Sequence, residues 1–206
     1  MIDPKIALQL LPGFLVGFTV HEASHALSAK WLGDNTAYRQ GRISLNPLKH
    51  LSPMGTIALF FLGFGWGKPV EINLYNFKKP KFYYLLSSLA GPLANLLLCA
   101  ASLGLIYLME LLTSDSQIQS GTMSVVMNIL LYSYIINAIL AILNLIPIPP
   151  LDGSKIWACI IPGIRPISSS RWNNAWFIVV MLLLFSGAIN KIINPVINIL
   201  LSILPK

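Results

Sequence analysis

Long apolar segments dominate this chain, and their lengths predict helices that cross a membrane. Each of four segments has at least the roughly 17 residues that a bilayer-spanning helix needs. They are residues 6–31, 83–112, 122–146 and 172–188. Gly91-Pro92 is expected to interrupt the second span, and residues 189–204 are expected to form an interfacial helix or part of a final hairpin. We therefore predict an all-α polytopic membrane protein of four to six transmembrane helices, in one domain covering residues 1–206.

The segment at 32–82, between the first two spans, has a different pattern. Asn-Pro, Ser-Pro and many glycines divide it into short pieces. Within it, Pro53–Trp66 is apolar but too short to span comfortably, which favours a re-entrant piece or one packed against the bundle. Arg42–Leu45 and Val70–Asn73 alternate between apolar and polar residues and could form short β-strands.

Composition supports the membrane assignment and excludes a sizeable soluble domain. Of 206 residues, 55% are hydrophobic and 10% are charged, whereas a soluble domain has about 25% charged residues. The net charge of +7 is better explained by loops that face the cytoplasm than by nucleic-acid binding. Cys99 and Cys159 lie in apolar surroundings without CxxC spacing, so we interpret them as small apolar residues.

The basic residues predict an orientation for the bundle. Eight lysines and arginines lie from Lys30, at the end of span one, to Lys81, just before span two. Three lie between spans three and four, and none lies in residues 113–121. The positive-inside rule then places 32–82 and 149–171 in the cytoplasm and the N-terminus outside. We expect a multi-pass protein of the plasma membrane whose active site faces the cytoplasm.

The first span contains the motif His21-Glu22-Ala23-Ser24-His25. Two histidines four residues apart share one helix face, so both imidazoles can bind a single metal ion. A glutamate between them is the general base of zinc metalloproteases with this spacing. Because ionisable groups at membrane depth are costly, their presence there indicates function. The alternative is a buried cluster of His21, Glu22 and His25 with a purely structural role, which we disfavour because of that cost.

A catalytic zinc takes three protein ligands and leaves one position open, so a third ligand is needed. Asp152 follows Pro147-Ile148-Pro149-Pro150, where the third span must break on its cytoplasmic side. This break would bring Asp152 to the membrane depth of the two histidines, which makes Asp152 the best candidate for the third ligand. The alternative is that Pro-Pro-Leu-Asp-Gly is an ordinary turn in which Asp152 caps the following helix. The less suitable candidates lie at the outer end or in the long cytoplasmic segment. They are Glu110, Asp115, Asp34, His50 and Glu71.

Taken together, these motifs resemble the site-2 protease family of intramembrane zinc metalloproteases, in its short bacterial-type branch. The matching pieces cover nearly the whole chain: His21–His25, Gly41–Pro47, Gly65–Val70, Ala90–Asn95 and Asn144–Gly153. The resemblance implies one zinc per chain with His21, His25 and Asp152 as ligands, and Glu22 as catalytic base. It also implies a site reached from the cytoplasm. No stretch is long enough for a PDZ domain or a pair of CBS domains.

Two asparagines in these motifs are candidates for substrate binding. Asn144 and Asn95 could hydrogen-bond the substrate backbone or the developing oxyanion. The alternative is that they bridge helices, as polar side chains in membrane bundles often do.

The resulting function is an intramembrane zinc metalloendopeptidase that cleaves membrane proteins in or near a transmembrane helix, within the lipid bilayer. The alternatives are a catalytically inactive zinc-binding scaffold or transporter, and a membrane-bound zinc hydrolase of soluble peptides. Glu22 argues against transport, because a transport site needs ligands rather than a base. No nucleic-acid partner is expected, and a homo-oligomer or a regulatory partner is left open.

Overall fold

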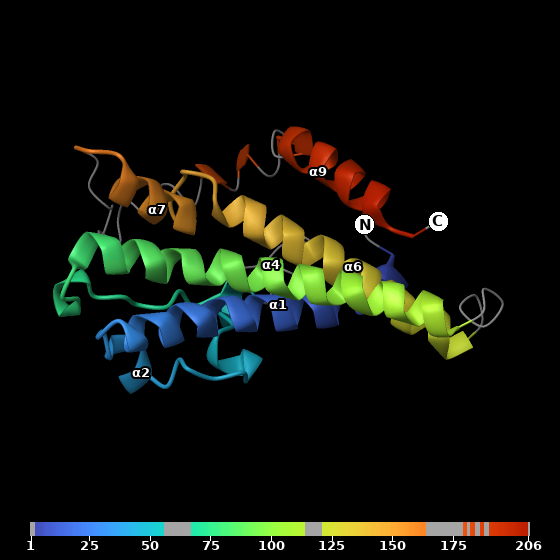
Figure 1. Cartoon of the computed structure of the whole chain (residues 1–206), viewed down its shortest axis with the longest axis horizontal. Helices are drawn as coiled ribbons and strands as arrows, with labels where there is room; N and C mark the ends of the chain where they lie inside the picture. The colour runs from blue at the N-terminus through green and yellow to red at the C-terminus, as the bar shows by residue number, and fades with distance from the viewer. Residues whose placement is uncertain are drawn as a thin grey trace.

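The computed structural model describes residues 3–55, 67–113, 121–163, 179–180, 182–183, 186–187 and 190–205. Within these residues the chain is mostly helical (Figure 1). The main helices are α1 (Pro4–Trp31), α4 (Pro80–Leu112), α6 (Gly121–Asn144), α7 (Asp152–Ile160) and α9 (Asn190–Ile203). The short helices are α2 (Thr36–Arg39), η1 (Pro47–Lys49) and η2 (Leu74–Asn76).

Helices α1, α4 and α6 are long and apolar enough to cross a membrane, and they lie side by side in the molecule (Figure 1). They confirm the spans predicted at 6–31, 83–112 and 122–146, and they support an integral membrane protein. Most of the fourth predicted span, 172–188, lies outside the described residues. Helix α9 occupies the segment at 189–204 and packs against α6, where Tyr134 Oη donates to the carbonyl of Leu200 over 3.2 Å.

The predicted interruption at Gly91-Pro92 is wrong, because α4 continues through Pro92 as one helix of 33 residues. A proline inside a helix removes one backbone hydrogen bond. Membrane helices tolerate this loss because neighbouring helices and local adjustments satisfy the freed groups. Pro92 is fully buried in the bundle, so packing holds the helix together at this point.

Helices α1 and α6 approach each other closely at two glycines of α1. A Cβ atom at Gly17 would lie 2.4 Å from Oδ1 of Asn137, and one at Gly13 would lie 2.5 Å from Oγ of Ser133. Small residues at such contacts allow membrane helices to pack backbone against side chain. This close approach places the polar residues of α6 next to those of α1 and α4.

The predicted strands at Arg42–Leu45 and Val70–Asn73 are wrong. In the described part of the segment between α1 and α4, β-pairing is limited to a single antiparallel bridge between Leu51 and Gly67. Side chains take the backbone groups that a strand ladder would use: the N–H of Val70 donates to Glu22. Residues 56–66 of the predicted re-entrant piece lie outside the described residues.

Asp34 attaches this segment to the end of α1. Its carboxylate is buried and accepts hydrogen bonds from the N–H and hydroxyl of Thr36, the N–H of Asn73 and the side-chain amide of Asn76, over 2.5–3.0 Å. Burial raises the pKa of Asp34, but these four hydrogen bonds outweigh it and lower the pKa below the usual value. The ionised carboxylate therefore fixes η2 against the turn that follows α1.

Candidate metal centre

Helix α1 places His21 and His25 on one face, against α4. Both side chains are buried, with 5% and 4% of their surface exposed. Their Nε2 atoms lie 3.1 Å apart. The spacing of four residues brings the two rings one above the other along the helix.

Nδ1 of each imidazole is hydrogen-bonded to an oxygen atom of α4. Nδ1 of His21 lies 2.6 Å from Oδ1 of Asn95, and Nδ1 of His25 lies 2.7 Å from the carbonyl oxygen of Ser87. Because these oxygens only accept hydrogen bonds, each Nδ1 carries the proton and donates it. In the neutral imidazoles both Nε2 atoms therefore keep a free lone pair, which is the form that binds a metal.

Asp152, at the start of α7, completes the cluster. Its Oδ2 lies 3.0 Å from Nε2 of His21 and 2.9 Å from Nε2 of His25. Its Oδ1 accepts a 2.8 Å hydrogen bond from Nζ of Lys155, one helical turn further along α7. Lys155 therefore leaves one carboxylate oxygen of Asp152 directed at the histidines.

The chemistry of these donors fits a divalent metal. Two imidazole lone pairs and a carboxylate oxygen face one another, each an acceptor in this protonation state, so a cation between them relieves their repulsion. Imidazole and carboxylate ligands suit zinc. Zinc–ligand bonds of about 2.0–2.1 Å in a tetrahedron separate the ligand atoms by about 3.3 Å. The observed separations of 2.9–3.1 Å are close to this value.

Two glycines make room for the cluster. A Cβ atom at Gly91 of α4 would lie 2.4 Å from Nε2 of His25 and 2.7 Å from Nε2 of His21. A Cβ atom at Gly153 of α7 would lie 2.2 Å from the carbonyl oxygen of Ile146. Gly91 therefore lets α4 approach the imidazoles, and Gly153 lets α7 fold back against the end of α6.

Comparison with known proteins identifies the family. Residues 9–187 match the sequence pattern of Peptidase family M50. The chain belongs to this family, the site-2 proteases. YwhC of Bacillus subtilis (strain 168) is 37% identical over 190 residues, which cover 89% of this chain and 83% of YwhC. Rip2 of Mycolicibacterium smegmatis is 28% identical over 199 residues, which cover 90% of this chain and 70% of Rip2.

Both relatives carry the words zinc metalloprotease in their names. No solved structure matches the chain. Family membership and these names make the protein a zinc metalloprotease, and its three long apolar helices place it in a membrane. The predicted family and enzyme class are confirmed.

In this M50 peptidase, Glu22 lies beside the His21–His25–Asp152 cluster rather than within it. It follows His21 on α1 and is rotated from it by about 100° around the helix axis. Its Oε2 accepts a hydrogen bond from the backbone N–H of Val70 over 3.1 Å. The segment that follows Gly67 therefore runs along the face of α1 that carries Glu22.

The structure brings only one of the two predicted substrate-binding asparagines to the metal centre. Asn95 is fully buried; besides accepting from His21, it donates to the carbonyl oxygen of Gly17 and to Oδ1 of Asn137 over 3.1 and 2.9 Å. Nδ2 of Asn144 donates to the carbonyl oxygen of Leu140 in its own helix. Substrate contact by either asparagine stays a prediction, and the geometry of Asn95 favours a role in orienting His21.

Three of the other acidic and histidine candidates are engaged elsewhere. Asp34 fixes η2, His50 Nε2 pairs with the carbonyl oxygen of Ser44, and Glu71 accepts from Gln40. Asp115 lies outside the described residues. Within the described part of the chain, His21, His25 and Asp152 form the one group of three histidine, cysteine or acidic residues close enough to share a metal ion.

Sequence reasoning missed Lys155 and the carbonyl of Ser87. Lys155 had a local signal, because a lysine three residues after an aspartate on a helix can pair with it. The carbonyl of Ser87 had none, since any residue at that position supplies the same acceptor.

Proposed function

We propose that this M50 peptidase cleaves peptide bonds in or near transmembrane helices of membrane-protein substrates, on the cytoplasmic side of the membrane. One zinc would be held by His21, His25 and Asp152, with Glu22 as general base. The observation that carries the proposal is the convergence of two imidazole lone pairs and one carboxylate oxygen within a bundle of apolar helices.

The roles of the protein groups follow from their positions. Zinc, when bound, supplies a Lewis acid that acidifies water and polarises the scissile carbonyl. Glu22 takes the proton of the attacking water and passes it to the leaving amine. Asn95 and the Ser87 carbonyl keep both imidazoles in the metal-binding tautomer. The nucleophile is water, so no acyl-enzyme forms.

The surroundings explain why the substrate must change shape. A transmembrane helix satisfies its own backbone hydrogen bonds, which hides its peptide bonds from attack. The substrate therefore has to unwind locally to present a carbonyl to the metal centre. The buried, helix-enclosed position of the cluster favours a substrate that enters laterally from the bilayer over a soluble peptide.

A cleavage experiment tests the activity. The chain is co-expressed with a panel of tagged single-span membrane proteins, as wild type, as Glu22→Gln and as Glu71→Gln. Glu71 pairs with Gln40 and serves as the matched carboxylate control. We expect cleavage by the wild type and Glu71→Gln and none by Glu22→Gln. Cleavage that survives in Glu22→Gln would exclude Glu22 as the base.

Metal analysis tests the ligands separately. Purified His21→Ala, His25→Ala and Asp152→Ala variants should contain much less zinc than the wild type, whereas Glu22→Gln should retain it. His50→Ala is the control, because His50 bonds to Ser44 away from the cluster. Full zinc occupancy in Asp152→Ala would remove Asp152 from the ligand set.

A further inference from the structure

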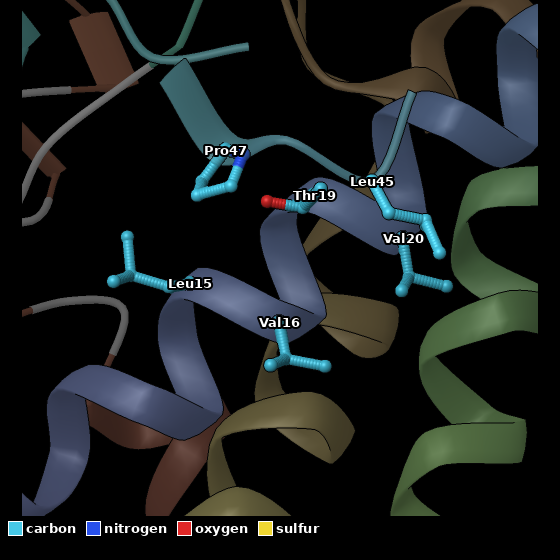
Figure 2. Close-up of a pocket in the computed structure, with 6 residues that line it drawn as sticks. All are labelled: Leu15, Val16, Thr19, Val20, Leu45 and Pro47. Carbon is cyan, nitrogen blue, oxygen red and sulfur yellow. The ribbon is translucent and has the colours of Figure 1, made fainter. Parts of the chain in front are cut away.

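A hollow of about 210 Å³ lies beside α1, between this helix and the segment at the start of η1 (Figure 2). Four of its lining residues come from α1, one from the loop before η1 and one from the first position of η1. They are Leu15, Val16, Thr19, Val20, Leu45 and Pro47. None of them is charged, and five of the six are apolar, so the pocket suits an apolar group.

One edge of the pocket, formed by Leu15 and Thr19, lies on the side of α1 that carries Glu22, whereas Val16 and Val20 lie further around the helix. Thr19 precedes Glu22 by three residues, or about 4.5 Å along the axis, and Leu15 precedes it by seven, which is two turns. Gly17, by contrast, faces α6. A peptide lying along α1 beside Glu22 would therefore pass the Leu15–Thr19 edge of this pocket within one or two turns of the cleavage position.

Thr19 gives the pocket a polar group without a partner. Only 3% of its surface is exposed, and its Oγ1 has no hydrogen-bond partner among the described residues. A helical threonine usually bonds to the carbonyl four residues earlier, which here is that of Leu15. In Figure 2 the hydroxyl oxygen points away from the helix and toward Pro47, across the pocket.

We propose that this pocket is a substrate subsite that receives one apolar side chain of the unwound peptide, while Thr19 hydrogen-bonds the peptide backbone. This inference rests on the proposed function. An unwound segment in an apolar environment carries backbone N–H and C=O groups that need partners, and Thr19 offers a hydroxyl that can donate or accept. A lipid acyl chain would fill the hollow but leave that hydroxyl unpaired, so the peptide is the better occupant.

The rim of the pocket is open to such a ligand. Leu45 has 74% of its surface exposed and Val16 has 52%. These exposed side chains leave the hollow accessible from outside the bundle, and its lining is apolar. The subsite should therefore select leucine-like side chains at one substrate position and reject aspartate or lysine there.

Cross-linking tests occupancy without requiring cleavage. Leu45→Cys is introduced into a Glu22→Gln, Cys99→Ala, Cys159→Ala background and mixed, in phosphatidylcholine vesicles, with a synthetic apolar transmembrane peptide that has a central Asn-Pro break. A single cysteine is placed at successive peptide positions. We expect disulfides at a few positions on one side of the break, and none with the control Leu8→Cys, which is exposed on α1 outside the pocket.

Two results would overturn the subsite. One is the absence of position-specific cross-links to Leu45→Cys. The other is labelling of the pocket by a photoactivatable phosphatidylcholine that the peptide does not displace, which would assign the hollow to lipid. If the wild type still cleaves membrane substrates in either case, the proposed function stands and only the subsite fails.

Kinetics test the role of Thr19. Thr19→Val keeps the shape and removes the hydroxyl, so kcat/KM for a cleaved substrate should fall about threefold to tenfold with zinc content unchanged. Thr19→Ser should restore it. Val16→Trp should shift the preference at one substrate position from leucine to alanine, whereas Leu8→Trp should not. Equal activity of Thr19→Val and wild type would remove the hydroxyl from substrate binding.

Discussion

Oδ1 of Asn95 lies 2.6 Å from Nδ1 of His21, and the same amide donates to the carbonyl of Gly17 and to Asn137. Nδ2 of Asn137 in turn donates to the carbonyl oxygen of Ser133. Carbonyl oxygens only accept hydrogen bonds. The side-chain amides of Asn95 and Asn137 therefore each have one orientation that makes all of these hydrogen bonds. Three helices thus determine which nitrogen of His21 is available to a metal.

This arrangement predicts the effect of removing Asn95. Asn95→Ala should weaken zinc binding by about 10- to 100-fold, because outer partners of metal-binding histidines fix the ring and its tautomer. Competition with a chelator, on purified protein, measures the affinity. Asn144→Ala, whose amide bonds within its own helix, should leave zinc affinity unchanged. Equal losses in the two variants would argue for general destabilisation instead.

Gly91 predicts a steric effect on the same site. Gly91→Ala places a Cβ atom 2.4 Å from Nε2 of His25, so the imidazoles must move and both zinc content and cleavage should drop severely. Gly104→Ala in the same helix meets nothing within 4 Å. It should keep full activity and gain up to about 1 kcal/mol of stability from helix propensity. Normal zinc content in Gly91→Ala would show that α4 can shift.

The orientation of the bundle can be tested at the two ends of α4. Tyr75, just before α4, is 95% exposed, and Leu112, at its other end, is 75% exposed. In a background without Cys99 and Cys159, Tyr75→Cys should react with a membrane-impermeant maleimide only after the cells are opened. Leu112→Cys should react in intact cells. The reverse pattern would place the metal centre toward the outside.

Asp34 predicts a pH-dependent contribution to stability. Its pKa is lower in the folded protein than the usual 3.8, so its stabilising effect is complete above that value and is lost as pH falls through the folded pKa. Asp34→Asn should lower the free energy of unfolding by about 2 kcal/mol at pH 7. Unfolding in detergent across pH measures it. The difference from wild type should shrink below pH 3.8, and a constant difference would exclude ionisation as its source.

Part of the candidate metal site could be predicted from local sequence, and part could not. His21 and His25 share a face because of helix periodicity alone, and the proline-rich break before Asp152 indicated where a third ligand could enter. The strands expected at Arg42–Leu45 and Val70–Asn73 did not form. Alternation of apolar and polar residues describes how a segment is buried, whereas strand pairing depends on whether its backbone groups are free. Here the backbone N–H groups of Val70 and Asn73 already donate to the carboxylates of Glu22 and Asp34.

The sequence by itself determined the membrane helices and the pair of imidazoles, because both depend on residues within a few turns of one another. Only the tertiary structure decided which atoms complete the site. Asn95 is 74 residues from His21, Ser87 is 62 from His25, and Asp152 is 131 from His21. These contacts exist because Gly17 and Gly91 let three helices approach closely, and the spacing of residues along one helix cannot encode the distance to another.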